Sequence, residues 1–308
     1  YPHIKRDGIA DNAPAPEPVV ILPHKPWPVE GGRCLASALH TAENMLVPAC
    51  LAVYLQFSGG RAEAVVQYGS LKGMALPLLT FPFGLLGSLS VLLMPEITQA
   101  HLRGQSGRLA ALIDRMLRLT GYFSALAGAA FWVWGQPLAE ALYGSAEAGS
   151  YLVILGPAMP LMYLESMVDG AMKGVGEQTA AFRYSVWDAV LRLAGVAVLL
   201  PRYGMRGFLA VMLLSTLYTC TANTGRLLLS SGMPHAFRRW LGAPALAGAL
   251  AAAAGTGLRQ ALALPLAGAF WPRLAALGAG GCATAGVFLL AAGPLGLGEE
   301  LARMRGTI

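Results

Sequence analysis

The sequence YGSLKGMALPLLTFPFGLLGSLSVLLMPEITQ, residues 68–99, decides the fold class of this chain. Between Leu71 and Pro95 the only charged side chain is Lys72, at the start of the apolar run. About 25 helical residues that rise 1.5 Å each cover about 37 Å, which exceeds the roughly 30 Å of a bilayer's hydrocarbon core. A buried helix of a soluble protein is rarely so long and so apolar, so this stretch predicts a membrane span.

The prolines and small residues of the same stretch also fit a membrane setting. Pro77 and Pro82 would break a helix in water, whereas in a membrane protein neighbouring helices and Ser/Thr side chains satisfy the carbonyls that proline frees. Gly84, Gly87 and Ser88 are small enough to allow another helix to approach closely. We therefore expect a second helix to pack against this part of the span.

The composition of the whole chain supports lipid as its solvent. Of its 308 residues, 12% are charged and 56% are hydrophobic, and the mean hydropathy is +0.55. A soluble domain carries about 25% charged residues, so about half of the usual solvating surface is missing. A net charge of +6 would by itself also fit a nucleic-acid binder. The positions of the basic residues favour a membrane protein instead, and we expect no nucleic-acid partner.

No motif for catalysis or for metal binding is present in the sequence. The segment GVGE at 174–177 contains Gly-x-Gly, but no strand precedes it and no Walker lysine follows, so it predicts a tight turn. No Ser/His/Asp, Cys/His or HExxH arrangement occurs, and we expect no enzyme activity, no cofactor and no bound metal. The cysteines lie singly, without metal-ligand spacing, and we interpret them as small buried hydrophobic residues: Cys34, Cys50, Cys220 and Cys282.

Apolar runs recur after residue 30 and predict an all-α polytopic membrane protein with about eight transmembrane helices. The predicted spans are 33–57, 70–95, 117–136, 149–171, 183–201, 207–230, 241–262 and 273–293. Residues 1–30 are rich in proline and carry charges of both signs, so they predict a flexible segment. Residues 31–231 form the predicted main body, and residues 232–308 add two further transmembrane helices and a cytoplasmic tail.

Lysine and arginine are more frequent in alternate loops, which predicts the orientation of the chain. The richer side contains Arg103, Arg108, Arg115, Arg118, Lys173, Arg183, Arg226, Arg238, Arg239, Arg303 and Arg305. These positions predict a multi-pass protein of the cell membrane with a cytoplasmic C-terminus. Residues 100–116 place basic and apolar side chains at helical spacing, which favours either a short helix on the cytoplasmic membrane surface or a solvated connector.

Ionisable groups inside the predicted spans are the candidates for a transport pathway, because each costs at least a few kcal/mol in a membrane core. Asp188 and Arg192 are four residues apart, the spacing of an ion pair on one helix face, so a purely structural role is also open for them. Asp169 also fits a role in cross-linking the turn that follows it. The candidates for contact with substrate or a coupling ion are Glu43, Asn44, Lys72, Glu165, Asp169, Asp188 and Arg192.

Five segments together resemble stage V sporulation protein B-like flippases, which are polysaccharide-biosynthesis proteins of the MATE-like exporter superfamily. They are ENMLVP (43–48), YGSLKGMALPLLTFP (68–82), LLMPEI (92–97), DGAMKGVGEQ (169–178) and LLPRYGMRG (199–207). Members of this superfamily have two six-helix lobes that face each other across a cavity, often followed by two extra helices. The resemblance implies that this chain is the C-terminal lobe with the extra pair. We therefore expect a fragment that lacks the N-terminal lobe.

The resemblance implies a flippase for undecaprenyl-diphosphate-linked saccharides, such as a peptidoglycan or spore-cortex precursor. Lipid II flippases carry an arginine on the helix that corresponds to residues 70–95, whereas this chain has Pro77 there, with Thr80 at a nearby acidic position. The implied contacts to the diphosphate are then Lys72 and Arg192. A coupling ion would be sensed by Glu43 and Asp169.

Two other functions are open from the sequence. A cation-coupled multidrug antiporter of the same fold would use acidic and aromatic residues, here Glu43, Glu165 and Trp187. A non-transporting membrane scaffold would instead recruit cell-wall synthesis proteins through its cytoplasmic loops. The expected partners are thus the lipid bilayer, a lipid-linked saccharide, an N-terminal lobe and cell-wall synthesis proteins.

Overall fold

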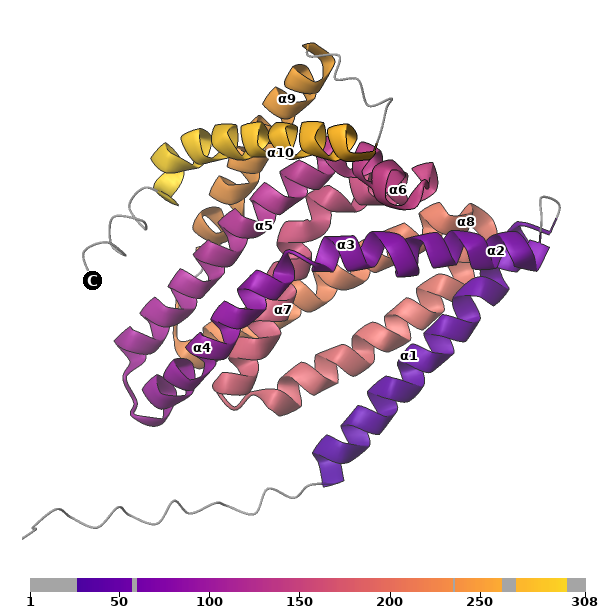
Figure 1. Cartoon of the computed structure of the whole chain (residues 1–308). Coiled ribbons are helices and arrows are strands. Elements are labelled where there is room, and N and C mark those ends of the chain that lie inside the picture. Colours follow the sequence, from indigo (N-terminus) through magenta and orange to yellow (C-terminus); the bar gives the residue numbers. More distant parts are fainter. Residues whose placement is uncertain (1–26, 57–59, 235, 262–269, 298–308) are drawn as a thin grey trace, which may run out of the picture.

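The computed structural model describes residues 27–56, 60–234, 236–261 and 270–297, and within these ranges every regular element is a helix (Figure 1). The predicted all-α fold is confirmed. Among the described residues, five helical segments are long and apolar enough to cross a membrane: Phe83–Leu102, Ala146–Gly174, Gln178–Ser231, Arg238–Gln260 and Leu274–Leu295. The predicted number of about eight spans stays a prediction.

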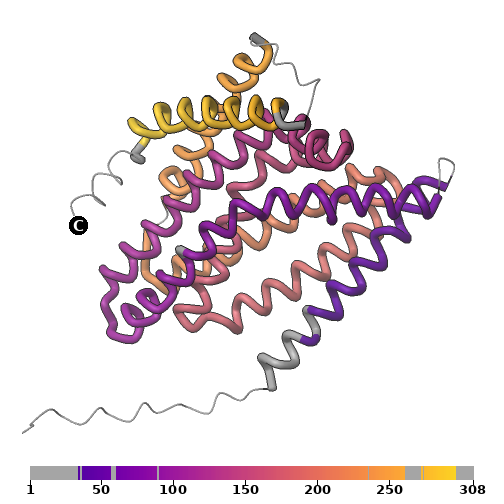
Figure 2. The backbone as a smooth tube through the Cα atoms, in the orientation of Figure 1, coloured from indigo at the N-terminus to yellow at the C-terminus, as the bar shows by residue number. Residues whose placement is uncertain are grey.

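The first part of the chain forms α1 (Trp27–Tyr54) and then a continuous helical rod. This rod consists of α2 (Gly60–Gly69), the π-helical η1 (Ser70–Ala75) and α3 (Leu76–Thr80), and α4 (Phe83–Leu102) follows at an angle (Figure 2). The residues between α3 and α4 form a turn that contains Pro82. The helix is thus interrupted inside the predicted span 70–95, because Pro82 has no backbone N–H to donate, and the candidate span of this region begins at Phe83.

The break between α3 and α4 is held by a neighbouring helix, as expected for a membrane protein. The hydroxyl of Tyr163, from α7 (Met159–Gly174), donates a hydrogen bond of 2.5 Å to the carbonyl oxygen of Leu79. The expected close packing at Gly84 and Gly87 is not found, since a Cβ atom added at either position would have no neighbour within 4 Å among the described residues.

Helix α5 (Ser106–Tyr143) is the centre of the bundle. It packs against α4, α6 (Ala146–Leu155), α7, α9 (Ala243–Ala261) and α10 (Phe270–Ala292). It begins directly after a turn and continues without interruption, so a separate surface helix over residues 100–116 is wrong. The physical reason is that the apolar side chains of its first turns, such as Leu109, Ile113 and Met116, are buried in the protein core.

The polar part of the molecule is built by α7 and α8. Helices α6 (Ala146–Leu155), η2 (Gly156–Ala158) and α7 (Met159–Gly174) follow one another, and α8 (Gln178–Ser231) runs back along α7 and α1. Helix α8 contains a kink at Gly204, whose φ of 58° and ψ of −143° are not helical. The kink divides α8 into two parts, which correspond to the predicted spans 183–201 and 207–230.

The C-terminal elements lie on the other side of α5. They are η3 (Arg238–Gly242), α9 (Ala243–Ala261), α10 (Phe270–Ala292) and η4 (Gly293–Leu297). The indole nitrogen of Trp134 donates to Thr284 at 3.0 Å, and Arg259 donates to the carbonyl oxygen of Val133 at 2.8 Å. The division of the chain at residue 231 stays a prediction, and most of the predicted flexible segment 1–30 lies outside the described residues.

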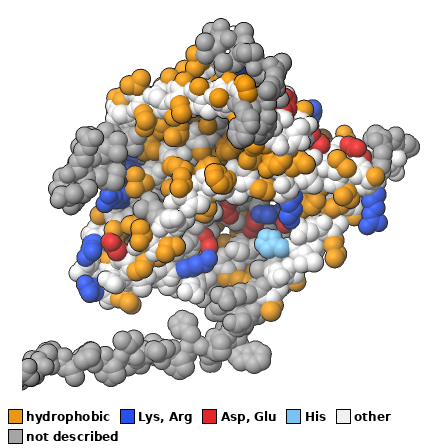
Figure 3. All heavy atoms as spheres, viewed as in Figure 1, with side chains coloured by type: hydrophobic (Ala, Val, Ile, Leu, Met, Phe, Trp, Pro, Cys, Tyr) orange, Lys and Arg blue, Asp and Glu red, His pale blue; other side chains and the backbone are white. Residues whose placement is uncertain are grey.

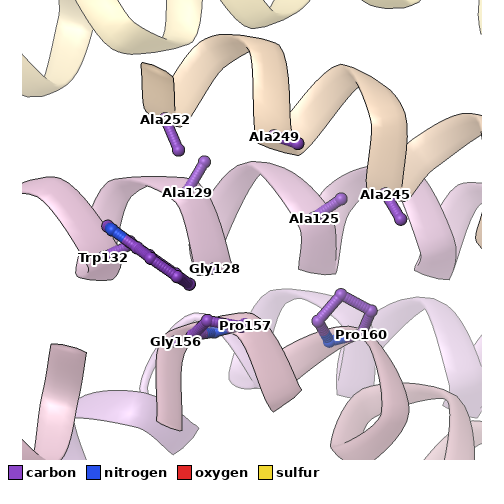
Figure 4. Close-up of a pocket in the computed structure, with 11 residues that line it drawn as sticks. Ala125, Gly128, Ala129, Trp132, Gly156, Pro157, Pro160, Ala245, Ala249 and Ala252 are labelled. Atoms are coloured by element: carbon purple, nitrogen blue, oxygen red, sulfur yellow. The ribbon is translucent and has the colours of Figure 1, made fainter. Parts of the chain in front are cut away.

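A small apolar cavity of about 210 Å³ separates α5, the η2 turn and α9 (Figure 4). Its lining consists of alanine, glycine and proline residues together with Trp132. Its lining contains no charged side chain, so the cavity has no group that could hold an ion.

The cysteines follow the prediction only in part. Cys220 is buried and Cys50 is half-buried, but Cys34 and Cys282 are exposed. The prediction of four buried cysteines is thus wrong for two of them, because their helix faces are not covered by other described elements. An exposed thiol on an apolar helix face is compatible with a lipid environment.

Candidate functional site

An arginine held between two carboxylates connects α1 to the first part of α8. Arg192 Nη2 lies 3.2 Å from Asp188 Oδ2, and Arg192 Nη1 lies 3.5 Å from Glu43 Oε2. Ser215, from the second part of α8, donates to Asp188 Oδ1 at 2.5 Å and accepts from Arg192 Nη2 at 2.9 Å. Asp188 and Arg192 thus form the ion pair that their spacing predicted, and the isolated acid Glu43 has a cationic partner from another helix.

A polar cavity of about 490 Å³ lies between α3, α4, α7 and α8. Most of its wall is contributed by α7 and α8, which supply its charged groups. Its lining residues are Leu76, Thr80, Phe83, Met162, Tyr163, Glu165, Ser166, Asp169, Ser185, Arg192, Met212, Thr216 and Asn223. The space-filling view shows acidic and basic side chains gathered in a hollow between α1 and α3, surrounded by hydrophobic surface (Figure 3).

The two acidic residues of α7 have different partners. Thr219 donates a hydrogen bond of 2.6 Å to Glu165 Oε1, so this carboxylate has a neutral partner. Asp169 Oδ2 lies 2.6 Å from Lys173 Nζ, one turn further along the same helix. Glu165 is therefore the acidic group of the cavity whose charge is least compensated among the described residues, since the nearby Arg192 already contacts two other carboxylates.

Asn223 is a buried polar residue with an unsatisfied oxygen. Its side chain lines the cavity and is only 4% exposed, and its Oδ1 atom has no hydrogen-bond partner among the described residues. A buried carbonyl oxygen without a partner costs about 1–3 kcal/mol. A hydrogen-bond donor or a cation inside the cavity would remove that cost.

Lys72, in the middle of the rod, contacts Asn44 of α1. The Lys72 ammonium group contacts Asn44 Oδ1, and the hydroxyl of Tyr68 donates to the same oxygen at 3.0 Å. Lys72 Nζ also lies 3.3 Å from the Tyr68 hydroxyl. Both partners of Lys72 are neutral, so its positive charge has no carboxylate partner among the described residues and is exposed.

A second hollow of about 470 Å³ follows the groove between α4 and α7. It shares Phe83 and Ser166 with the polar cavity, so the two hollows adjoin. Its wall is mainly apolar, with Val91 and Met94 on α4, and Lys173 lies in its lining. A molecule with a polar head and an apolar tail would match this pair of hollows.

The structure thus divides the predicted site residues into groups. Glu165, Asp169 and Arg192 line the cavity, and Asp188 and Glu43 are connected to it through Arg192. The remaining two, Lys72 and Asn44, form their own contact on η1 and α1. Trp187, expected for an antiporter, is 61% exposed and is not part of the cavity lining.

The site residues predicted from the sequence do not include the polar residues that the second part of α8 contributes to the site. Ser215, Thr219 and Asn223 are spaced by four residues and therefore lie on one helix face. This repeat of polar side chains inside an apolar run was the available signal. Within the described ranges, no group of three or more His, Cys, Asp or Glu residues is placed to hold a metal ion.

Comparison with known proteins supports the resemblance found in the sequence. No family model matches the chain. The sporulation protein YkvU of Bacillus subtilis (strain 168) is 26% identical over 206 residues, which are 66% of this chain and 43% of that protein. Stage V sporulation protein B of the same organism is 24% identical over 175 residues, which are 57% of this chain and 33% of that protein. The matches thus span less than half the length of these relatives.

Proposed function

We propose that this chain, a multi-pass membrane protein related to stage V sporulation protein B, forms one lobe of a flippase for lipid-linked saccharides. The observation that supports this most directly is the polar cavity inside an otherwise apolar bundle. Charged and amide groups are expensive in a membrane unless they line a hydrated pathway or pair with one another. Glu165, whose hydrogen-bond partner Thr219 is neutral, and Asn223, whose oxygen has no partner among the described residues, are the groups that would gain from a polar occupant.

The shape of the site fits an amphipathic substrate. The polar cavity and the apolar groove adjoin at Phe83 and Ser166, so a saccharide headgroup and its lipid tail would occupy separate, neighbouring spaces. Exposed hydrophobic side chains of α4, such as Leu85, Val91 and Leu92, lie on the helix that lines the groove, so a lipid-linked substrate would enter from the bilayer. A lipid-linked molecule therefore fits the site better than a soluble sugar, which would leave the apolar groove unoccupied.

The distribution of charge separates the role of Lys72 from that of Arg192. Arg192 is already neutralised by two carboxylates, so it has little positive charge to offer a diphosphate. Lys72 has only neutral partners and is the better candidate for that contact. The proposed site therefore places the anionic diphosphate near Lys72 and the saccharide in the polar cavity.

A second candidate function, cation-coupled antiport, is favoured by one specific observation. The cavity combines the Glu165 carboxylate with the unsatisfied oxygen of Asn223, and both groups attract a proton or a metal cation. In a coupled flippase the same groups would hold the coupling ion. In an antiporter they would bind a cationic drug, so the two functions differ in the charge of the transported molecule.

The proposed orientation places the α4–α5 and α7–α8 connections on the cytoplasmic side of the cell membrane, together with the C-terminus. Both connections lie at the same end of the bundle (Figure 1). Arg103 lies in the first connection, and Lys173 and Arg183 lie in the helices that flank the second, as the positive-inside rule expects on the cytoplasmic side. The proposed partners remain an N-terminal lobe and proteins of cell-wall synthesis.

The test measures binding and translocation separately. The purified chain is titrated with an undecaprenyl-diphosphate-linked saccharide in detergent, and translocation of a fluorescent analogue is followed in proteoliposomes with and without a co-expressed N-terminal lobe. We expect Lys72→Met to weaken binding about tenfold, the loss of one charge-assisted contact, and Arg61→Gln, an exposed cation on the same rod, to leave it unchanged. Absence of binding, or saturable uptake of cationic dyes instead, would refute the flippase proposal.

A further inference from the structure

A separate basic cavity lies where α7 ends and α8 begins. It has a volume of about 280 Å³ and is lined by Glu177, Thr179, Ala180, Arg183, Tyr184 and Arg226. The turn before α8 includes Gly176, whose φ of 83° reverses the chain. The second part of α8 returns to the same place and contributes Arg226. This cavity shares no lining residue with the polar cavity or with the groove.

Arg226 is fixed in position by a two-pronged ion pair. Its Nε and Nη2 atoms donate to the two carboxylate oxygens of Glu177 at 3.0 and 2.8 Å. This fork uses one edge of the guanidinium and leaves its other N–H groups available, and the Arg226 side chain remains 43% exposed. Arg226 is thus held rigidly with donors still free to bind an anion.

Arg183 supplies the uncompensated charge of the cavity. It is exposed, and no hydrogen bond or ion pair involves it among the described residues. The cavity therefore combines two guanidinium groups with one carboxylate, which gives it a net positive charge. The hydroxyl groups of Thr179 and Tyr184, in the same lining, are further hydrogen-bond donors.

The position of this cavity at the ends of two candidate spans indicates which kind of ligand it binds. It lies at the junction of two candidate spans, Ala146–Gly174 and Gln178–Ser231. At the end of a membrane span the bilayer presents its phosphate groups, and guanidinium groups bind phosphate oxygens through paired hydrogen bonds. We propose that Arg183 and Arg226 bind the phosphate of an anionic membrane lipid in this cavity. The proposal does not depend on the transport function, because the groups involved are different.

The experiment measures lipid binding to the purified full chain by native mass spectrometry. The probes are phosphatidylglycerol, phosphatidylcholine and inorganic phosphate as a competitor. Arg183→Gln is compared with Arg103→Gln, which removes an equally exposed arginine from the α4–α5 turn at the same end of the bundle. We expect Arg183→Gln to weaken phosphatidylglycerol binding about fivefold and Arg103→Gln to leave it unchanged.

A third variant separates anion binding from a structural role. Glu177→Gln removes the carboxylate that competes for Arg226, so we expect phosphatidylglycerol to bind more tightly, whereas a purely structural ion pair predicts weaker binding. Displacement of the lipid by inorganic phosphate supports the phosphate site and identifies a soluble phosphate as a possible source. Lack of displacement supports the lipid headgroup as the source. Equal losses for Arg183→Gln and Arg103→Gln, or equal binding of both lipids by the wild-type chain, would overturn the proposal.

Discussion

Removal of Arg192 is the substitution that most directly tests the charge cluster of α1 and α8. Its guanidinium faces two carboxylates that are only 13% and 10% exposed, those of Glu43 and Asp188. Arg192→Gln would leave two negative charges close together with little solvent to screen them. Removing one partner of a fully buried ion pair costs about 3–5 kcal/mol, whereas hydrogen bonds between membrane helices contribute at most about 1.7 kcal/mol. For this partly exposed cluster we expect a loss of about 2–3 kcal/mol in the free energy of unfolding.

The two carboxylates should differ in their contributions. Asp188 lies 3.2 Å from Arg192 and also accepts from Ser215 at 2.5 Å, so Asp188→Asn should cost about 1–2 kcal/mol. Glu43 lies 3.5 Å from Arg192 and supplies the second of two negative charges, so Glu43→Gln should cost less than about 1 kcal/mol. The expected order of destabilisation is thus Arg192→Gln, then Asp188→Asn, then Glu43→Gln.

The assay is reversible unfolding in mixed micelles, in which added dodecyl sulfate unfolds the protein and circular dichroism follows the loss of helix. The double variant Asp188→Asn with Arg192→Gln should lose at least about 1 kcal/mol less than the sum of the two single losses, because both side chains belong to one ion pair. Additive losses, or a larger cost for Glu43→Gln than for Arg192→Gln, would refute the reasoning.

Two further predictions concern the backbone. Gly204→Ala should destabilise the chain by about 2–4 kcal/mol in the same unfolding assay. The reason is that φ is 58° at the kink and the new Cβ atom would lie 2.6 Å from the ring of Tyr54. An unchanged midpoint of unfolding would contradict this backbone conformation at Gly204. Gly121→Ala should destabilise by about 3 kcal/mol or more, since its Cβ atom would lie 2.0 Å from the backbone oxygen of Trp240. Its control, Gly107→Ala, has open space at the new Cβ and should stabilise by about 0.5–1 kcal/mol, so equal effects at the two glycines would argue against the close contact of α5 with η3.

The sequence predicted those features that depend on hydrophobicity and local spacing. The all-α membrane fold followed from apolar runs, and the pair Asp188–Arg192 followed from the four-residue spacing of opposite charges on one helix. Pro82 is evident in the sequence, but its effect on the helix is not, because a proline can either be accommodated inside a span or end it. The outcome depends on the helices packed around the proline, and here Tyr163 of α7 donates a hydrogen bond to the carbonyl oxygen of Leu79 beside the turn.

The contacts between helices could not be predicted from one sequence. Glu43 and Arg192 are separated by 149 positions in the chain, and no local pattern relates them. The same holds for Lys72 with Asn44 and for Arg226 with Glu177, which depend on the angles at which the helices cross. Each buried charge nevertheless needs a partner, so a chain with few ionic groups in its spans can form only a few different ion pairs between helices.

In the proposed flippase, the balance of charge in the cavity determines which part of a lipid-linked substrate the cavity can accept. With Arg192 neutralised, the cavity offers Glu165 and the Asn223 oxygen, which attract donors and cations and repel a diphosphate. A neutral saccharide, whose hydroxyl groups donate hydrogen bonds, has no such conflict. The diphosphate must then lie outside the acidic part of the cavity, beside a cation without a carboxylate partner. Among the described residues next to the site, Lys72 meets that condition, so the effect of Lys72→Met on diphosphate-containing ligands, compared with the free saccharide, tests the whole arrangement.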